Sequence, residues 1–207
     1  MEQPDLIGLG ATPAGFVYQS EFLSPQEENE LLQRMKSLPF QEAVYRQWQA
    51  RRRIVSYGGR YDFSRRSLDP APPIPDFLDF LRQRMAEWAA IPPDAIQHAV
   101  IAEYGIGTQL GWHRDVPQFD QVMGVSIAGR ARMRLRPYPP AKGARAAVAI
   151  ELARRSAYRF HGPARWEWQH AISPTRELRY SITFRTLRRR KGDPAQVAVE
   201  TLQDPRH

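Results

Sequence analysis

The stretch GWHRDV places His113 and Asp115 two positions apart, directly after a glycine-rich segment. In an extended backbone the side chains of residues i and i+2 point to the same side, so both could meet one metal ion. The chain has no cysteine, which leaves histidine and carboxylate as its metal-binding chemistry. One more histidine would complete the facial triad of two histidines and one carboxylate that holds non-haem Fe(II) with open coordination positions.

The third ligand must come from one of the other histidines. His98 lies in an alternating segment that predicts a strand, where a structural role is expected, and His207 is the terminal residue. His161 lies between YRF and GP, which favours a turn or a supporting role. His170 follows RWEWQ, an amphipathic pattern that suits an inward-facing ligand. His161 and His170 are therefore both candidates.

A second constellation occurs in RYSITFR, near the C-terminus. In a strand, a period of two places four polar side chains on one face: Arg179, Ser181, Thr183 and Arg185. A solvated edge strand is the plain interpretation of this face. The alternative is a row of donors for a dicarboxylate, because the planar guanidinium of arginine binds carboxylates bidentately. Such a row beside a facial-triad iron is what a 2-oxoglutarate oxygenase requires.

The first part of the chain predicts the helices that would support this site. In SPQEENELLQRM, Ser24 is a typical N-cap, Pro25 suits the first turn, and Glu27 completes a capping box. Apolar residues recur at helical spacing within APPIPDFLDFLRQRMAEWAA, which predicts a second helix. We expect both helices to cover a sheet. Between them, RRRIVSYGGRYDFSRRSL predicts a hairpin or mobile loop with exposed aromatic side chains.

Strands dominate from residue 96 onward. Alternating or apolar runs predict strands at 96–104, 122–129, 130–136, 148–152, 157–162 and 177–187. The run RARMRLR alternates strictly, with its arginines on one face and Ala131, Met133 and Leu135 on the other. Several short strands separated by turns indicate a β-sandwich or barrel rather than a doubly wound sheet.

Length, composition and charge restrict the class of protein. A chain of 207 residues suffices for one domain with a sizeable core and is short for two. No apolar run reaches the length of a membrane span, and the acidic N-terminal segment lacks the features of a signal peptide. We therefore expect a cytoplasmic protein with no membrane partner. The net charge of +8 favours a polyanionic partner such as nucleic acid, although part of the excess comes from RTLRRRKGD.

Three segments, taken in order, resemble a known family. YGIGTQLGWHRDVP, GPARWEWQHAI and LRYSITFR are similar to the motifs of the AlkB family of Fe(II)/2-oxoglutarate dioxygenases. The resemblance implies an α+β, mainly β fold: a double-stranded β-helix (jelly roll) with N-terminal helices packed on the sheet and a nucleotide-recognition lid. Residues 1–190 would form a single oxygenase domain, with the lid and helical region at about 20–95 and the jelly-roll core at about 96–187. Residues 191–207 would be a C-terminal tail.

The resemblance carries the iron and cosubstrate sites over position by position. The residues that match the iron ligands are His113, Asp115 and His170. Arg179 matches the arginine that holds the distal carboxylate of 2-oxoglutarate, and Arg185 matches the arginine near its metal-chelating end. The other positions of the cosubstrate pocket are Tyr104, Ser181 and Thr183. Fe(II), 2-oxoglutarate and O₂ are thus the expected cofactor and cosubstrates, and His161 has no matching role.

The substrate positions follow from the same resemblance. YGGRYDFS resembles the nucleotide-recognition lid, so Tyr61 and Phe63 are the candidates for stacking on a flipped base. Arg114 and Pro117, on either side of the iron aspartate, are the other positions expected to contact the substrate.

Three positions depart from the family pattern. Pro117 stands where nucleic-acid demethylases of the family often carry an acidic residue, which affects substrate choice. Ser181 stands where the family usually has asparagine, and Ala102 replaces a polar residue often found two positions before the tyrosine. The last two leave the iron chemistry intact.

The implied function is oxidative demethylation of N-alkylated DNA or RNA bases, with release of formaldehyde, succinate and CO₂, as in direct reversal of alkylation damage and DNA repair. The base would be single-stranded or flipped, because a stacked base cannot reach the metal. The arginines of 130–136 would engage phosphates or form a solvated face. Two alternatives stay open: the same dioxygenase chemistry on a protein, lipid or small molecule, and a non-catalytic nucleic-acid-binding module. We expect a monomer.

Overall fold

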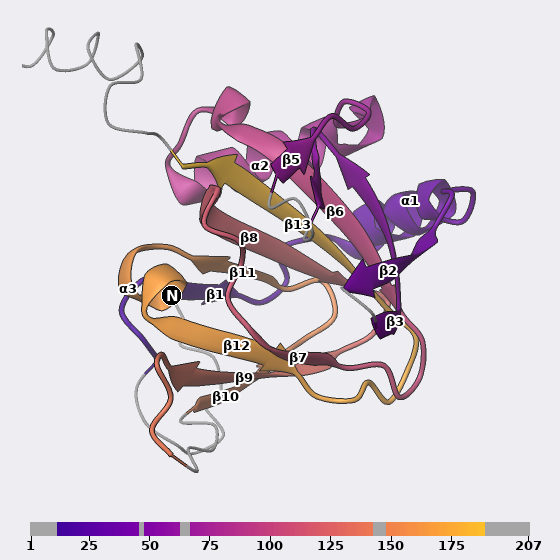
Figure 1. Ribbon diagram of the computed structural model, residues 1–207. Helices are drawn as coiled ribbons and strands as arrows, with labels where there is room; N and C mark the ends of the chain where they lie inside the picture. Colours follow the sequence, from indigo (N-terminus) through magenta and orange to yellow (C-terminus); the bar gives the residue numbers. More distant parts are fainter. Residues whose placement is uncertain (1–11, 46–47, 63–66, 143–147, 189–207) are drawn as a thin grey trace, which may run out of the picture.

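The computed structural model describes residues 12–45, 48–62, 67–142 and 148–188, in which two β-sheets face one another and two helices cover the outer side of the larger sheet (Figure 1). The helices are α1 (Pro25–Met35), α2 (Asp79–Ala89) and α3 (Gly162–Trp166), with 3₁₀ turns at η1 (Asp76–Leu78) and η2 (Pro93–Ala95). Within the described ranges, none of these helices has the length and apolarity needed to cross a bilayer.

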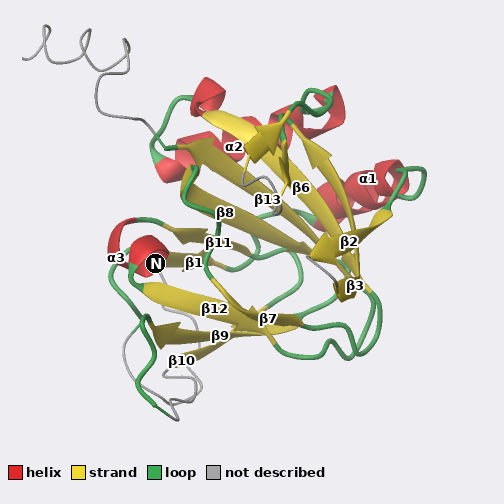
Figure 2. Ribbon diagram, viewed as in Figure 1, coloured by secondary structure: helices red, strands yellow, loops and turns green. Residues whose placement is uncertain are grey.

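Both large sheets are antiparallel (Figure 2). The larger sheet consists, in spatial order, of β1 (Phe16–Gln19), β11 (Ala157–Phe160), β8 (Phe119–Ile127), β13 (Arg179–Leu187), β6 (Ile96–Tyr104), β3 (Trp48–Tyr57) and β2 (Gln41–Tyr45). The smaller sheet consists of β10 (Val148–Leu152), β9 (Ala131–Pro137), β12 (Trp168–Ile172) and β7 (Leu110–His113). A separate pair joins β4 (Arg60–Asp62) to β5 (Ser67–Asp69). This is the mainly β jelly roll that the sequence predicted.

Helix α1 begins as its capping box predicts. The Ser24 hydroxyl accepts a hydrogen bond from the Glu27 amide at 3.2 Å, and the Glu27 carboxylate accepts one from the Ser24 amide at 2.8 Å. The same carboxylate pairs with Arg84 of α2 at 2.5 Å, so the cap also joins the two helices. The hydrogen bond from Arg84 lowers the pKa of Glu27 to about 2, although burial acts in the opposite direction.

The second helix forms where its apolar spacing predicted it. Proline disfavours a helical residue before it, and the η1 turn begins directly after the last proline of the segment and continues into α2 at Asp79. The buried residues that the two helices place on the sheet include Leu31, Met35, Leu81 and Met85. They pack with the outer faces of the central strands, including Ile101, Val125, Ile182 and Phe184.

A second core lies between the sheets. The larger sheet contributes Val122, Tyr158 and Phe160, and the smaller sheet contributes Met133, Leu135, Ile150 and Ile172. The predicted alternation of β9 is confirmed, because Ala131, Met133 and Leu135 are buried while Arg132 is exposed. This core packs the two sheets against each other, which brings β7 and β12 opposite the centre of the larger sheet.

Two expectations about strands need correction. The segment expected to be a hairpin or mobile loop does contain an antiparallel pair, β4 with β5, but its first part belongs to β3, which pairs with β6 within the larger sheet and buries Tyr57. The plain interpretation of RYSITFR as a solvated edge strand is also wrong, because β13 lies between β8 and β6 and Arg179 is only 1% exposed.

Candidate metal centre

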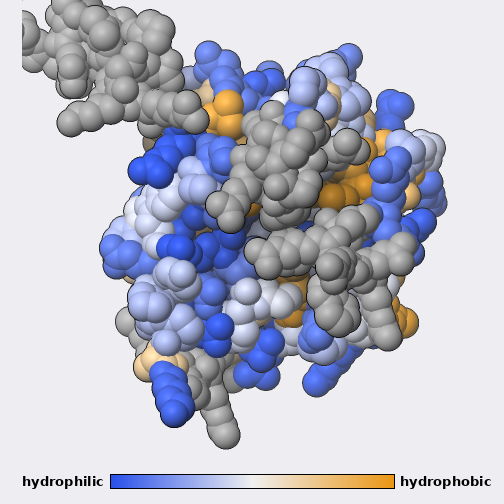
Figure 3. Space-filling view, in the orientation of Figure 1, coloured by the Kyte–Doolittle hydropathy of each residue, from blue (hydrophilic) through white to orange (hydrophobic). Residues whose placement is uncertain are grey.

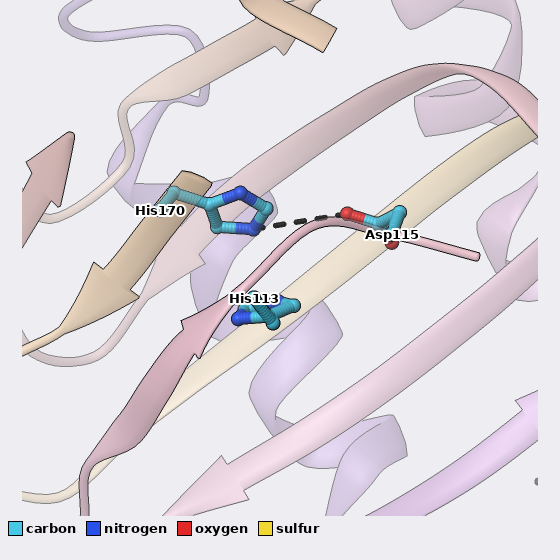
Figure 4. A group of neighbouring side chains, drawn as sticks. All are labelled: His113, Asp115 and His170. Atoms are coloured by element: carbon cyan, nitrogen blue, oxygen red, sulfur yellow. Dashed lines mark ion pairs between the residues drawn. The ribbon is translucent and has the colours of Figure 1, made fainter. Parts of the chain in front are cut away.

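Three side chains from the smaller sheet and its next loop converge on one point (Figure 4). His113 is the last residue of β7, Asp115 follows it in the loop to β8, and His170 lies on β12 directly opposite His113 in the strand register. One ligand atom from each residue lies within 4.8 Å of the other two. The Nε2 atom of His170 lies 3.7 Å from Oδ2 of Asp115. Two imidazoles and one carboxylate at this spacing can hold a divalent metal ion.

Hydrogen bonds and ring contacts orient both imidazoles. The Nδ1 atom of His113 lies 2.8 Å from the carbonyl oxygen of Gly111, so Nδ1 carries the proton and Nε2 is left as the metal-binding nitrogen. The His170 ring stacks on Phe160 with the centroids 4.9 Å apart and lies 4.1 Å from the His113 ring. The geometry therefore selects which nitrogen of His113 faces the shared point.

The protonation states suit a metal. Burial lowers the pKa of both histidines, that of His170 to about 3, although Asp115 opposes the shift. Burial alone would raise the pKa of Asp115, but the charge of Arg185, joined at low pH by those of the protonated imidazoles, outweighs it and holds this pKa far below its usual range. At neutral pH the group is thus a carboxylate with two neutral imidazoles, the forms that bind a metal.

The inner face of β13 forms one wall of the site. Residues that pair across β6, β13 and β8 share this face and make four rows: Arg179 with Tyr104, Ser181 with Ala102 and Ser126, Thr183 with Val100 and Gly124, and Arg185 with His98 and Val122. The two middle rows carry small side chains, and the Tyr158 ring packs over Gly124 in one of them. The departures at Ser181 and Ala102 fall in the same row.

Arg179 is buried, and no charged partner contacts it within the described residues. Its Nε donates a hydrogen bond to the Ser126 hydroxyl at 2.9 Å, and its guanidinium lies 5.1 Å from the centroid of the Tyr104 ring. Its Nη1 atom is buried and has no hydrogen-bond partner within the described part of the chain. A buried guanidinium with an unused donor is costly unless an anion joins it, so this end of β13 fits the carboxylate of a ligand.

Arg185, at the other end of the row, is already paired. Its Nε donates a hydrogen bond to Oδ1 of Asp115 at 2.8 Å, while Oδ2 of the same carboxylate faces His170. Its Nη1 lies 3.3 Å from Nδ1 of His98. Arg185 thus holds the carboxylate of the triad in place.

Sequence reasoning missed several residues of this site. His98 had been taken as a structural histidine, but it contacts Arg185; burial and the charge of that arginine lower its pKa to about 3. Ser126 holds Arg179, and the Nη1 atom of Arg52 lies 3.5 Å from the Tyr104 hydroxyl. The only signal for these residues is strand register, which places them on the same face as β13 once the pairing of the strands is known.

The substrate positions are only partly described. The Tyr61 side chain and Phe63 lie outside the described residues. Arg114 is exposed: its guanidinium stacks 3.7 Å from the Tyr138 ring and donates a hydrogen bond to the Trp166 carbonyl at 2.7 Å. Pro117 is exposed in the same loop.

Arginines and aromatic rings continue beyond Arg114. The guanidinium of Arg188 lies 4.8 Å from the Trp166 ring, and Arg114 donates to the carbonyl of the same tryptophan. These two arginine–aromatic pairs, which we call the rim, are Arg114 with Tyr138 and Arg188 with Trp166. Hydrophilic side chains predominate on this side of the molecule, over α3 and β12 (Figure 3). His161 precedes α3 and is not part of the ligand cluster, within the ranges that the structure describes.

Comparison with known proteins agrees with this geometry. A family model described as the 2OG-Fe(II) oxygenase superfamily matches residues 15–185. An uncharacterized protein of Acanthamoeba polyphaga mimivirus is 29% identical over 199 residues, covering 86% of this chain and 87% of that protein.

Two solved structures share the fold. That of OsALKBH1 has a TM-score of 0.66 at 19% identity and covers 86% of this chain and 100% of that chain. A prolyl hydroxylase from Trichoplax adhaerens, in complex with a peptide fragment of the hypoxia inducible factor oxygen degradation domain, has a TM-score of 0.58 at 15% identity and covers 84% of this chain and 83% of that chain. The fold is therefore shared by an AlkB homologue and by an oxygenase bound to a peptide.

Proposed function

We propose that this protein, which belongs to the 2OG-Fe(II) oxygenase superfamily, demethylates N-alkylated bases in DNA or RNA. Membership of the superfamily makes it an oxidoreductase that uses Fe(II), 2-oxoglutarate and O₂. The observation that carries the proposal is the ligand triad beside a buried guanidinium that has no anionic partner in the described part of the chain. The fold shared with OsALKBH1 supports the choice of substrate class. We place the reaction in the cytoplasm, in the repair of alkylated nucleic acid by a monomer.

His113, Asp115 and His170 would hold the iron. When bound, iron supplies the activation of O₂ that hydroxylates a substrate methyl group while 2-oxoglutarate is decarboxylated to succinate. The protein would hold the reactants in position between the two sheets. Arg185 fixes the Asp115 carboxylate by its 2.8 Å hydrogen bond, so that carboxylate keeps one oxygen toward the histidines.

The cosubstrate would lie along the inner face of β13. Arg179 would bind the distal carboxylate through its unused Nη1, and the Tyr104 hydroxyl would donate to the same group. Burial would raise the pKa of Tyr104, but Arg52 and Arg179 outweigh it and lower this pKa, so the hydroxyl is a strong donor. Ser181 and Thr183, which lie between the two arginines on this face of β13, would lie beside the carbon chain of 2-oxoglutarate.

The rim beside the triad supports a nucleic-acid substrate. Arginine side chains bind phosphates, and aromatic rings stack on bases. Arg114 and Arg188 stack on rim aromatics only a few residues from Asp115 and from the end of β13. A base carrying an N-methyl group would enter from this rim, and the hydroxylated methyl group would leave as formaldehyde, which restores the N–H of the base.

The direct test measures succinate and formaldehyde release with methylated and unmethylated oligonucleotides, single- and double-stranded, DNA and RNA. Methylated strands should stimulate both products in equal amounts, and matched unmethylated strands should not. The Asp115→Ala variant is the control for background oxidation. Succinate release that ignores every methylated strand would show that nucleic acid is not the substrate.

The rim has its own test. Arg114→Ala should raise the KM for a methylated oligonucleotide and reduce the salt slope of binding by about one, because one phosphate contact is lost. The KM for 2-oxoglutarate should not change. Arg34→Ala, which removes an exposed arginine on the outer helix α1, is the matched control. Equal effects of both variants would mean that only net charge matters and that the rim is not a binding site.

A second candidate function is the same oxygenase chemistry on a protein. Pro117, exposed in the loop beside Asp115, offers no carboxylate to a nucleobase, and the prolyl hydroxylase that shares the fold binds a peptide. Under this alternative, peptides rather than oligonucleotides would stimulate succinate release. Pro117→Asp would separate the two: it should improve turnover of a methylated base if the rim receives one, and should weaken or leave unchanged the turnover of a peptide.

A further inference from the structure

The loop between β7 and β8 carries a metal ligand but lies outside both sheets. The chain leaves the smaller sheet at His113 and enters the larger one at Phe119, so the pairings of the described strands do not include residues 114–118. Carbonyl groups in such a crossing need other partners, because a buried carbonyl without a hydrogen bond costs free energy. The position of Asp115 therefore depends on whatever binds this backbone.

One buried side chain binds it. Arg165, on α3, is 4% exposed, and its Nη2 donates hydrogen bonds to three backbone carbonyls: those of Asp115 at 3.2 Å, Val116 at 2.8 Å and Phe119 at 2.8 Å. The loop thus turns around a single nitrogen atom. Since α3 runs almost directly into β12, the same arginine connects the loop of Asp115 to the strand of His170.

We infer that Arg165 is a positioning residue for the metal centre, a role that rests on the triad of the proposed function. It touches no ligand atom. Instead, it fixes the backbone from which the Asp115 side chain projects, while Arg185 fixes the carboxylate itself. Without Arg165 the three carbonyls lose their common donor, and the loop is free to move the carboxylate away from the two imidazoles. The metal should then bind more weakly even in a folded protein.

The experiment uses the metal-free full chain with Co(II) as probe. Calorimetry gives the affinity, and the intensity of the visible Co(II) absorption reports the coordination geometry. Arg165→Met should lower the affinity on the order of 10-fold, the size of effect seen when groups that support metal ligands are removed. Arg165→Lys keeps the charge, but its single ammonium is set back from the position of Nη2, so we expect an intermediate loss.

The matched control is Arg84→Met. Arg84 also joins two elements and donates to a backbone carbonyl, that of Phe22 at 3.2 Å, but it lies on the outer helices. This variant should lower the thermal stability of the metal-free protein and leave Co(II) affinity unchanged. A merely structural role for Arg165 would give the same result as Arg84→Met.

The outcomes separate the possibilities. A folded Arg165→Met protein with wild-type Co(II) affinity and absorption overturns the inference, as does an equal loss of affinity in Arg84→Met. If Arg165→Met does not fold, Arg165→Lys decides, and wild-type affinity in that variant overturns the inference. A wild-type protein that binds no Co(II) would overturn the metal centre itself, whereas wild-type binding with unaffected variants removes only the role of Arg165.

Discussion

Arg179 and Arg185 are the same residue type on the same face of the same strand, yet their surroundings differ. Arg185 is committed to the protein: it binds the Asp115 carboxylate at 2.8 Å and contacts His98. Arg179 is 1% exposed, donates a hydrogen bond to the neutral Ser126 hydroxyl through its Nε, lies against Tyr104, and keeps a buried Nη1 without a partner in the described part of the chain. Arg185 thus contributes to the structure of the protein, whereas Arg179 can bind a ligand.

This difference explains how one strand can serve two purposes. The attraction within a buried ion pair offsets part of the free-energy cost of removing both charges from water. A buried charge without a counter-charge has nothing to offset that cost. The protein therefore carries a free-energy penalty at Arg179 that a bound dicarboxylate would relieve, and that relief would stabilise the complex. At Arg185 no such penalty remains, because Asp115 is present.

The largest expected effect on activity comes from removing the carboxylate that distinguishes Arg185 from Arg179. Asp115→Ala removes a triad ligand and leaves Arg185 as unpaired as Arg179, so iron-dependent succinate release should fall to the background of the reaction without enzyme. The free energy of unfolding should also fall, by about 3 kcal/mol, because a charge is left buried alone. Asp120→Ala, at a nearby carboxylate outside the triad, is the control. Retained turnover in Asp115→Ala would remove this residue from the metal centre.

The next effect concerns the arginine left for the ligand. Arg179→Met should raise the KM for 2-oxoglutarate about 10- to 100-fold, since a hydrogen bond to a charged group contributes about 1.5–3 kcal/mol. Arg179→Lys should fall between, because lysine keeps the charge but lacks the fork. Initial rates of succinate release against 2-oxoglutarate concentration give both constants. An unchanged KM would place the cosubstrate carboxylate elsewhere.

The same two arginines should have opposite effects on the ligand-free protein. Arg179→Met removes an uncompensated charge and should leave the free energy of unfolding unchanged or raise it by about 1 kcal/mol. Arg185→Met leaves the Asp115 carboxylate without its arginine partner and should lower the free energy of unfolding by about 3 kcal/mol. Urea unfolding of metal-free protein without 2-oxoglutarate measures both. Equal losses in the two variants would contradict the view that, among the described residues, Arg185 has an anionic partner and Arg179 has none.

Local patterns in the sequence predicted much of the fold. The capping box at Ser24 and the strand at 96–104 are confirmed at their predicted residues, because both depend on neighbours in the sequence. The pairing of β3 was not predicted, because it is decided by a partner, β6, some fifty residues away.

The candidate site shows the same division. His113 and Asp115 were found because they are two positions apart, and the arginines of β13 because they alternate. The local sequence favoured His170 over His161, because RWEWQ predicts a strand and GP a turn, but both stayed candidates until the family resemblance selected His170. Arg165 and His98 were missed, because their contacts with the site arise only when α3 and β6 are placed beside the loop and strand that hold Asp115 and Arg185.

The last prediction concerns His98, which contacts Arg185, and the pH dependence of the free energy of unfolding. Burial and the charge of Arg185 lower the pKa of His98 to about 3, from a usual value of 6.5. The unfolded chain then binds more protons than the folded one between these values, so the contribution of neutral His98 is full above pH 6.5 and is lost as the pH falls toward 3. At pH 5.5 the loss is about 1 kcal/mol.

His98→Asn, which does not titrate, should therefore lose less stability than the wild type between pH 7.5 and 5.5 in urea unfolding of the metal-free protein. His170 and His113, whose pKa values are also lowered, contribute equally in both proteins, so the difference isolates His98. Parallel pH profiles would mean that His98 is already protonated in the folded protein. In that case it could not accept a hydrogen bond from Arg185, and Asp115 alone would distinguish the surroundings of Arg185 from those of Arg179.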